Sequence, residues 1–379
     1  MDFNLTDDQR MLDETLRRYL AQSCDISRRN AEAYGPEGMS PARWAELAEL
    51  GVIGALLTEA EGGFAGTGFD IALVFEALGR ALVPEPFRGA LLTAKALAAV
   101  GPGQEGALAP MLAGLLDGSV IGAFAGEEAD SQFDPLWIAT RARAEGAGYV
   151  LTGVKVAVEA AEAAGLFIVT ARLSGAPGEA GGLALFAVPA DTPGLSVTGH
   201  GRVDGGRAGV LTLHGAALPE AALIAEGAAA FDLIGTLGDY ADLALAAEAL
   251  GVMSVMQEAT LDYIKLRRQF GRPIGSFQDL QHRMADIMVL LAQARSAVIN
   301  AATLPADRAA RAKAMAAARF TLAESGRRVA EEAIQMHGGI GMTWDVPLSH
   351  YMKRLTMIGQ SHGDEDHHLA RYIALSRAA

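Results

Sequence analysis

The chain has 379 residues and a formal net charge of 31 − 45 = −14 at pH 7. Apolar residues make up 51% of it and charged residues 20%, a globular composition that excludes general disorder and a collagen-like fibre. A field this acidic repels phosphate backbones and anionic membrane surfaces, so we expect neither nucleic acid nor a membrane as a partner. At about 150 residues per domain, the length predicts two or three domains.

Cys24 is the only cysteine, which excludes an internal disulfide and a cysteine-based metal cage. The first residues lack the basic and apolar regions of a signal peptide, and no run reaches 18 uninterrupted apolar residues. These features predict a cytoplasmic protein.

The first third of the chain has helical periodicity. Thr6 and Gln9 form the capping-box pattern that opens a helix. Further helices are expected over 41–51, 69–83, 86–100 and 104–117, with glycine and proline between them. We therefore predict an N-terminal all-helical domain over residues 1–118.

The pattern then changes to short segments with β-branched or aromatic residues, separated by glycine-rich breaks. Strands are expected at 149–152, 166–173, 183–188, 195–198 and 210–213. No crossover helices lie between them, so we predict a middle antiparallel β domain over 119–225.

Long helical periods return from about residue 230 and predict four long helices, the last beginning near Asp364. Short connections favour an antiparallel four-helix bundle over 226–379. The predicted fold class is α+β multidomain: an N-terminal all-α domain, a middle antiparallel β domain and a C-terminal four-helix bundle.

The segment Tyr263–Gln278 places a basic and aromatic cluster at the end of one helix and begins the next. Arg267 is suited to a bidentate grip on a pyrophosphate, and Phe270 offers a flat apolar face. The alternative is a solvated arginine cluster at a helix C-terminus, with Phe270 in the core.

The segment Gln335–Trp344 ends a long helix at two adjacent glycines. Gly338 and Gly339 would let the backbone approach a ligand closely. The alternative is an ordinary glycine cap with Gln335 exposed.

These two segments, with the opening Met1–Gln9, Phe75–Arg80 and Gly153-x-Lys155, resemble the acyl-CoA dehydrogenase family over essentially the whole chain. The resemblance implies a FAD-binding subunit that oxidises an acyl-CoA thioester to the 2,3-enoyl-CoA. A carboxylate base would take the α-proton, the flavin would take the β-hydride, and an electron-transfer flavoprotein would accept the electrons.

The resemblance further implies that each flavin lies between two subunits. The bundle of one subunit holds the pyrophosphate and adenosine, and the β domain of the other holds the isoalloxazine ring. The residues that match the bundle side are Arg267, Phe270, Gln278, Gln335, Gly338 and Gly339.

The ring side departs from the family pattern. Gly126 stands where the family has a flavin-contacting threonine, and Ser131 is the candidate to replace that hydroxyl. Ala157 and Glu159 stand where an aromatic residue and a hydroxyl are usual. A carboxylate beside reduced, anionic flavin would be repulsive unless it is protonated or turned away.

The usual catalytic glutamate is absent. His362 occupies its position, and Asp242 lies beside Ala241, the position of the base in some members. His362 and Asp242 are thus the catalytic candidates. The alternatives are a loop histidine and an acid on an exposed helix turn. No metal site is expected at Asp364–His368, because an aspartate N-cap explains that run.

The closing segments His350–Ile358 and Gly363–His368 resemble the small subunits of heteromeric enzymes such as pimeloyl-CoA dehydrogenase. This resemblance implies a heterotetramer with a large-subunit homologue that supplies the missing side chains. Two alternatives stay open: a self-sufficient homo-oligomeric dehydrogenase with a displaced base, and a non-enzymatic acyl-CoA-binding or scaffold protein.

Overall fold

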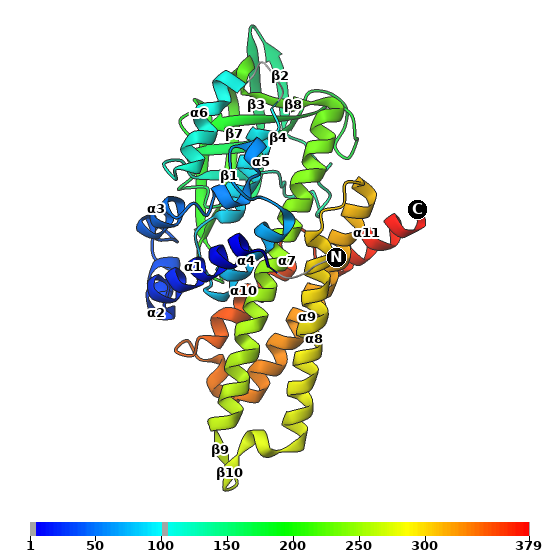
Figure 1. The fold of residues 1–379 in the computed structure, drawn as a ribbon. Coiled ribbons are helices and arrows are strands. Elements are labelled where there is room, and N and C mark those ends of the chain that lie inside the picture. The colour runs from blue at the N-terminus through cyan, green and yellow to red at the C-terminus, as the bar shows by residue number, and fades with distance from the viewer. Residues whose placement is uncertain (1–4, 101–104, 379) are drawn as a thin grey trace. The chain divides into compact units, whose positions relative to one another are not determined.

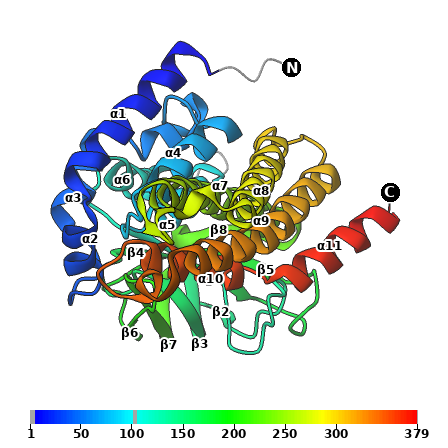
Figure 2. The same cartoon turned by 90° about the horizontal axis from the view of Figure 1, so that it is seen from below.

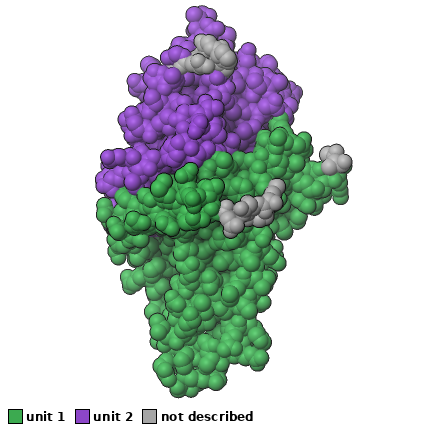
Figure 3. Space-filling model, in the orientation of Figure 1, with its two compact units in different colours: residues 1–29, 67–83, 242–379 green, residues 30–66, 84–241 purple. Residues whose placement is uncertain are grey.

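A computed structural model describes residues 5–100 and 105–378 (Figure 1). The first four residues of the opening motif lie outside this range. The chain forms two compact units, coloured separately in Figure 3. Residues up to 29, 67–83 and 242–379 make one, which we call the bundle unit. Residues 30–66 and 84–241 make the other, the sheet unit. The predicted boundaries at 118 and 225 stay a prediction.

Five of the N-terminal helices described by the structure begin and end close to where their sequence patterns predict, whereas α2 (Ile26–Ala33) was not predicted. The Thr6 hydroxyl accepts a hydrogen bond from the backbone N–H of Gln9, and the Gln9 side-chain oxygen accepts one from the backbone N–H of Thr6. The predicted capping box is therefore present. The helices are α1 (Asp7–Ser23), α2 (Ile26–Ala33), α3 (Pro41–Glu49), α4 (Gly68–Arg80), α5 (Phe87–Ala98) and α6 (Glu105–Leu116).

The sheet unit is built on one mixed sheet. Its strands are β1 (Gly122–Ala125), β2 (Arg141–Glu145), β3 (Gly148–Glu159), β4 (Leu166–Arg172), β5 (Leu183–Pro189), β6 (Leu195–Gly201), β7 (Arg207–Pro219) and β8 (Leu223–Glu226). The order is β6-β7-β3-β2-β4-β5-β8, and β1 pairs with β4. Most neighbours are antiparallel, as predicted. β1 and β2, however, pair with β4 in parallel, which strand patterns alone do not reveal.

The bundle has one helix more than predicted. After α7 (Gly227–Leu266) the chain forms a hairpin of β9 (Arg268–Gln269) and β10 (Arg272–Pro273). Then follow α8 (Gln278–Ala302), α9 (Arg308–His337), α10 (Leu348–Gln360) and α11 (Glu365–Ala378). α10 was not predicted as a separate element, and α11 is the helix expected near Asp364. α9 packs along α8, α10 and α11 (Figures 1 and 2).

Two glycines allow close packing of α4 on α7 within the bundle unit. A Cβ on Gly79 would lie 2.2 Å from the Glu248 carbonyl oxygen, and one on Gly251 would lie 2.1 Å from that of Glu76. Among the described helices, α8 alone is long and apolar enough to cross a membrane by composition. That criterion is weak evidence, because helices of ordinary bundles also meet it.

A buried ion pair crosses the core of the sheet unit. The Lys155 ammonium lies 2.7 Å from Glu128 Oε1 and donates to the Thr170 hydroxyl at 2.9 Å. Burial lowers the pKa of Lys155 to about 8, although Glu128 opposes this shift. The Glu128 carboxylate also accepts from the backbone of Ala139 and Thr140, so it fixes the start of β2.

Replacing Lys155 by methionine leaves the Glu128 carboxylate buried without its cation. We expect Lys155→Met to lower the free energy of unfolding by about 3–5 kcal/mol in urea denaturation, the usual cost of breaking a buried pair. Lys155→Met/Glu128→Gln should recover part of the loss. Arg143→Met, in an exposed pair of the same sheet, is the control and should be nearly neutral. A Lys155→Met protein as stable as the wild type would contradict this.

Candidate functional site

The end of α7 carries an aromatic side chain in a strained turn. Phe270 and Gly271 connect β9 to β10 with φ of +51° and +79°. Such a two-residue turn favours asparagine or glycine at its first position, because a larger side chain is disfavoured at positive φ. The Phe270 side chain is nonetheless 90% exposed. It is therefore not the core residue of the alternative interpretation, and its strain is not offset by burial.

Two polar side chains near this turn have no hydrogen-bond partner in the described part of the chain, whereas those of Arg268 and Gln269 bond to backbone carbonyl groups of the turn. Arg267 and Gln278 are exposed, and neither side chain makes a hydrogen bond within residues 5–100 and 105–378. Phe277 supports the turn: its ring is perpendicular to that of Phe270, with centroids 6.0 Å apart, and the Arg272 guanidinium lies 4.1 Å above it. The unpaired guanidinium of Arg267 therefore lies three residues before Phe270, whose ring contacts that of Phe277.

The second motif reaches the same end of the bundle. The Tyr263 ring stacks on the His337 ring at 4.2 Å, and its hydroxyl donates to the His337 carbonyl at 3.3 Å. α9 ends there because Gly338 adopts φ 68° and ψ −153°, a conformation open only to glycine. The structure therefore brings the two motifs together, although Tyr263 and His337 are 74 residues apart in sequence.

The glycines at this end leave their surroundings open. A Cβ added to Gly338 or Gly339 would meet nothing within 4 Å, and Gln335 is exposed. With the free guanidinium of Arg267 and the ring of Phe270, this gives the donors and the flat face that a pyrophosphate and an aromatic base require. These bundle-end residues fit one end of FAD.

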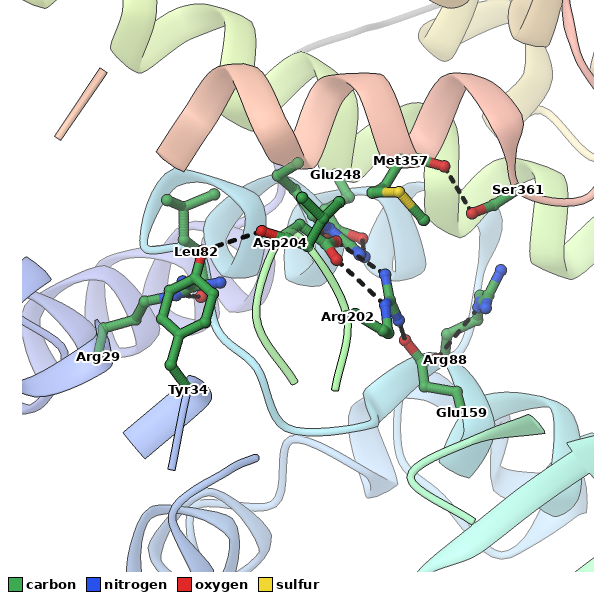
Figure 4. Close-up of polar contacts among 12 residues, drawn as sticks. Arg29, Tyr34, Leu82, Arg88, Glu159, Arg202, Asp204, Glu248, Met357 and Ser361 are labelled. Carbon is green, nitrogen blue, oxygen red and sulfur yellow. Dashed lines mark hydrogen bonds and ion pairs between the residues drawn. The ribbon is translucent and has the colours of Figure 1, made fainter. Parts of the chain in front are cut away.

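The ring-side positions lie in the sheet unit. The Ser131 side chain makes no hydrogen bond within the described ranges. Ala157, at φ +54°, lies in a bulge of β3. Glu159 accepts from Arg202 at 2.8 Å and from Arg88 at 3.4 Å (Figure 4). Its negative charge is therefore balanced by two guanidinium groups, an arrangement that the sequence did not indicate.

The two catalytic candidates touch each other. His362 Nδ1 lies 3.1 Å from Asp242 Oδ1. Arg371 donates to the other oxygen of Asp242 at 2.9 Å, and Arg319 Nε lies 3.4 Å from Oδ1. The Asp242 side chain is completely buried, so the alternative of an acid on an exposed helix turn is wrong. Of the pair, only His362, with 26% of its side chain exposed, reaches solvent.

The charge state of Asp242 follows from these neighbours. Burial alone would raise its pKa. The hydrogen bond from His362 and nearby positive charge, that of Arg319 included, outweigh burial and lower the pKa of Asp242 well below its ordinary value. Asp242 is therefore a fixed anion at neutral pH and a weak base.

Arg319 and Arg371 hold this anion, and neither was among the residues predicted for the site. The sequence held a usable signal for Arg319, which interrupts the helical face formed by the apolar residues Met315, Ala318 and Leu322. In the structure Arg319 is 1% exposed. A buried arginine requires an acidic or carbonyl partner. Asp242 likewise stands in an otherwise apolar stretch of α7.

His368 lies beside the same cluster and is 1% exposed. Neither of its ring nitrogens has a hydrogen-bond partner among the described residues. Burial lowers the pKa of His368 to about 3, although Asp242 opposes the shift. In the described ranges, no group of three or more His, Cys, Asp or Glu side chains is arranged to hold a metal ion.

The bundle-end residues and the Asp242–His362 pair lie far apart on one helix. From Asp242 to Leu266 the helix rises through 266 − 242 = 24 residues, which at about 1.5 Å each separates them by about 36 Å. The chain therefore carries two separate clusters of candidate residues, one at each end of this stretch of α7.

Residues 6–105, 123–212 and 237–373 match the N-terminal, middle and C-terminal domains of acyl-CoA dehydrogenases, in that order. Acyl-CoA dehydrogenase IpdE2 of Mycobacterium tuberculosis is 31% identical over 349 residues, which cover 92% of this chain and 91% of that protein. The ChsE4–ChsE5 complex from Mycobacterium tuberculosis contains a chain with TM-score 0.85 and 27% identity, covering 100% and 99%. PigA, solved with FAD and proline, shares the fold at TM-score 0.89 and 24% identity, covering 99% and 100%.

The low pKa of His368 predicts acid sensitivity. The unfolded chain binds a proton at this residue near pH 6.5, but the folded chain does so only near pH 3. Stability from this residue is therefore complete above pH 6.5 and falls by about 1.4 kcal/mol per pH unit below it. We expect His368→Leu to flatten the fall in unfolding free energy between pH 6.5 and 4. His282→Leu, on the exposed side of α8, should leave that fall unchanged. Equal slopes for His368→Leu and the wild type would refute this assignment.

Proposed function

Because this chain belongs to the acyl-CoA dehydrogenase family of FAD-dependent oxidoreductases, we propose that it is the small subunit of a heteromeric acyl-CoA dehydrogenase. Its substrate is an acyl-CoA thioester, and an electron-transfer flavoprotein takes the electrons in the cytoplasm. The large-subunit homologue supplies the standard glutamate that this chain lacks. Bound FAD supplies the hydride acceptor, and the bundle end of this chain helps to hold it.

The 36 Å between the bundle end and the Asp242–His362 pair supports a second chain at the flavin, and the departures from the family pattern at the ring side and at the base position favour a different protein as that chain. Arg267, Phe270, Gly338 and Gly339 have the chemistry to hold a dinucleotide, but no reacting group of the same chain lies near them along α7. These four residues can therefore contribute only to a flavin whose ring is bound by residues outside this end of the bundle. A second chain meets that requirement.

The sheet unit of this chain lacks several side chains that contact the flavin ring in the family, which supports a different subunit as the source of those contacts. Ala157 has no aromatic ring that could cover a flavin, and Gly126 has no hydroxyl group that could form a hydrogen bond to the flavin. Glu159 is engaged with Arg88 and Arg202. The bundle-end contacts are thus retained while the ring contacts are reduced. The ChsE4–ChsE5 complex supplies a precedent for a two-protein assembly on this fold.

One observation favours a second candidate, a homo-oligomeric dehydrogenase that uses its own displaced base. The contact between His362 and Asp242 gives this chain a hydrogen-bonded imidazole where the family has its glutamate. The number of flavins bound separates the two candidates, because a homo-oligomer would bind FAD without another protein.

The proposal predicts that FAD binding requires two different proteins. The chain expressed alone should contain little FAD, and co-expression with its large-subunit homologue should give flavin absorbance and acyl-CoA oxidation. Stoichiometric FAD and turnover by the chain alone would reject the heteromer in favour of the homo-oligomer.

Within the co-expressed complex, Arg267→Ala should weaken FAD binding about 10- to 100-fold, which corresponds to the loss of a charge-assisted hydrogen bond. Equilibrium dialysis against FAD measures this change. Arg18→Ala, which removes an exposed arginine on α1, is the matched control and should leave affinity unchanged. Equal FAD affinity in the Arg267→Ala and wild-type complexes would contradict the proposed role of the bundle end.

A further inference from the structure

We propose that two copies of this chain bind each other through the outer face of α8, which is formed by Ala285, Met288, Val289, Ala292 and Ser296. The two helices lie antiparallel, about a two-fold axis between Val289 and Ala292. This inference goes beyond the proposed function, because it concerns the contact between two identical chains and holds wherever the flavin binds. In a heteromer, the same contact would join two pairs of unlike chains.

The first observation is that α8 is apolar and yet largely uncovered. Among the described helices it alone is long and apolar enough to cross a membrane by composition, but only 28% of its most apolar stretch is buried. A core helix that meets this criterion is mostly buried, and α8 is not. Met288 and Val289 are 55% and 56% exposed. Apolar residues gathered on one exposed surface are characteristic of a binding site for another protein.

The second observation is that α8 has two opposite faces. Ile287, Ala294 and Ala301 recur at every seventh position and are completely buried, so they form the inner face. α8 packs on α9 and α4 within the bundle unit, and its yellow ribbon forms one edge of that unit in Figure 1. At about 100° per residue, Val289 and Ala292 point to the opposite side of the helix, and both are exposed.

The outer face of α8 has the spacing of a seam between two helices. Ala285, Val289, Ala292 and Ser296 follow one another at intervals of four, three and four residues, so they form one stripe along the helix. The Ser296 hydroxyl donates to the Ala292 carbonyl oxygen of its own helix at 2.9 Å. This stripe can therefore be buried without leaving a side-chain hydroxyl unsatisfied.

The sizes of these residues favour an antiparallel pair. With the axis between Val289 and Ala292, Val289 of each copy lies opposite Ala292 of the other, and Ala285 lies opposite Ser296. Every layer of the seam then contains an alanine, so the two helices can approach closely over this length. A parallel pair would place Val289 against Val289 and Ala292 against Ala292, which leaves thick and thin layers side by side. The helix dipoles also favour the antiparallel direction.

The charges beside the seam are compatible with this pairing. Asp286 is exposed and makes no hydrogen bond or ion pair within residues 5–100 and 105–378. In the antiparallel pair it lies beside Gln293 of the second copy, whose amide group can donate to the carboxylate, and the two-fold axis repeats this contact. Arg295, on the other side of the seam, is paired with Glu76 of its own chain at 3.1 Å, so its charge is already balanced. Like charges therefore do not face each other.

The test replaces Val289, at the centre of the face, by aspartate. Val289→Asp would bury two carboxylates without cations, so we expect self-association of the full chain to weaken at least about 100-fold in sedimentation velocity. In the co-expressed complex, native mass spectrometry should show two copies of this chain for the wild type and one for the variant. Val203→Asp is the matched control: this valine is 59% exposed in the sheet unit, and its replacement should leave both measurements unchanged.

A complementary pair of variants tests the antiparallel register. Ala292→Lys alone should also weaken self-association, because its ammonium would face Val289 of the other copy. A mixture of the Val289→Asp and Ala292→Lys chains should associate again, since the new carboxylate then lies opposite the new ammonium. This recovery would also exclude misfolding as the cause of the loss. A mixture that stays apart would overturn the antiparallel pair.

Three other outcomes would assign the face to another occupant or to none, and each would overturn the proposal. Equal masses for the wild-type and Val289→Asp chains would show that two copies do not meet here. Loss of the large-subunit homologue from the Val289→Asp complex, with the second copy retained, would assign the face to that protein. A monomeric wild-type chain that floats with phosphatidylcholine–phosphatidylglycerol vesicles, when Val289→Asp does not, would assign it to a membrane.

The proposed function is tested separately, because FAD content reports on the unlike chain and not on this contact. If Val289→Asp separates two copies of a chain that binds FAD fully by itself, the heteromer is refuted and the α8 contact stands. If FAD binding requires two proteins but Val289→Asp leaves the mass of the complex unchanged, only the α8 contact is refuted.

Discussion

The bundle depends on one buried negative charge. Asp242 lies on α7, has no exposed surface, and is paired with Arg319 on α9 and Arg371 on α11. A carboxylate without these cations would be very costly in this position, so the three helices can pack only in the arrangement that brings the charges together. Arg319 also binds the carbonyl groups of the loop between α10 and α11. The same ion pairs that stabilise the bundle therefore fix His362.

The length of α7 separates two clusters of candidate functional residues. Its beginning in the bundle unit holds the Asp242 cluster, and its end carries the Phe270 turn and Arg267 about 36 Å away. This spacing is consistent with the proposed shared cofactor, because the residues that can hold a dinucleotide lie far from the position of the family's base. The exposure of Phe270 and the open space around Gly338 are consistent with such an assembly, because both leave room for a ligand.

The sequence predicted the features that depend on neighbouring residues. The Thr6 cap, the glycine end of α9, the N-cap of Asp364 and most helix positions follow from local propensity. The burial of Asp242 does not, because its partners His362 and Arg371 lie 120 and 129 residues along the chain. The same limit applies to Glu159. From the sequence its carboxylate is expected to repel reduced flavin, whereas in the structure it is paired with Arg88 and Arg202. The parallel pairing of β1 with β4 is likewise invisible in the pattern of either strand.

The central claim is that this chain holds the dinucleotide end of a flavin whose ring belongs to another chain. Hydrogen–deuterium exchange on the co-expressed complex, with and without FAD, tests it most directly. The account predicts that FAD protects residues 263–278 and 335–344 of this chain and leaves residues 126–131 and 157–159 unchanged. Protection of residues 126–131 and 157–159, with none at the bundle end, would contradict it.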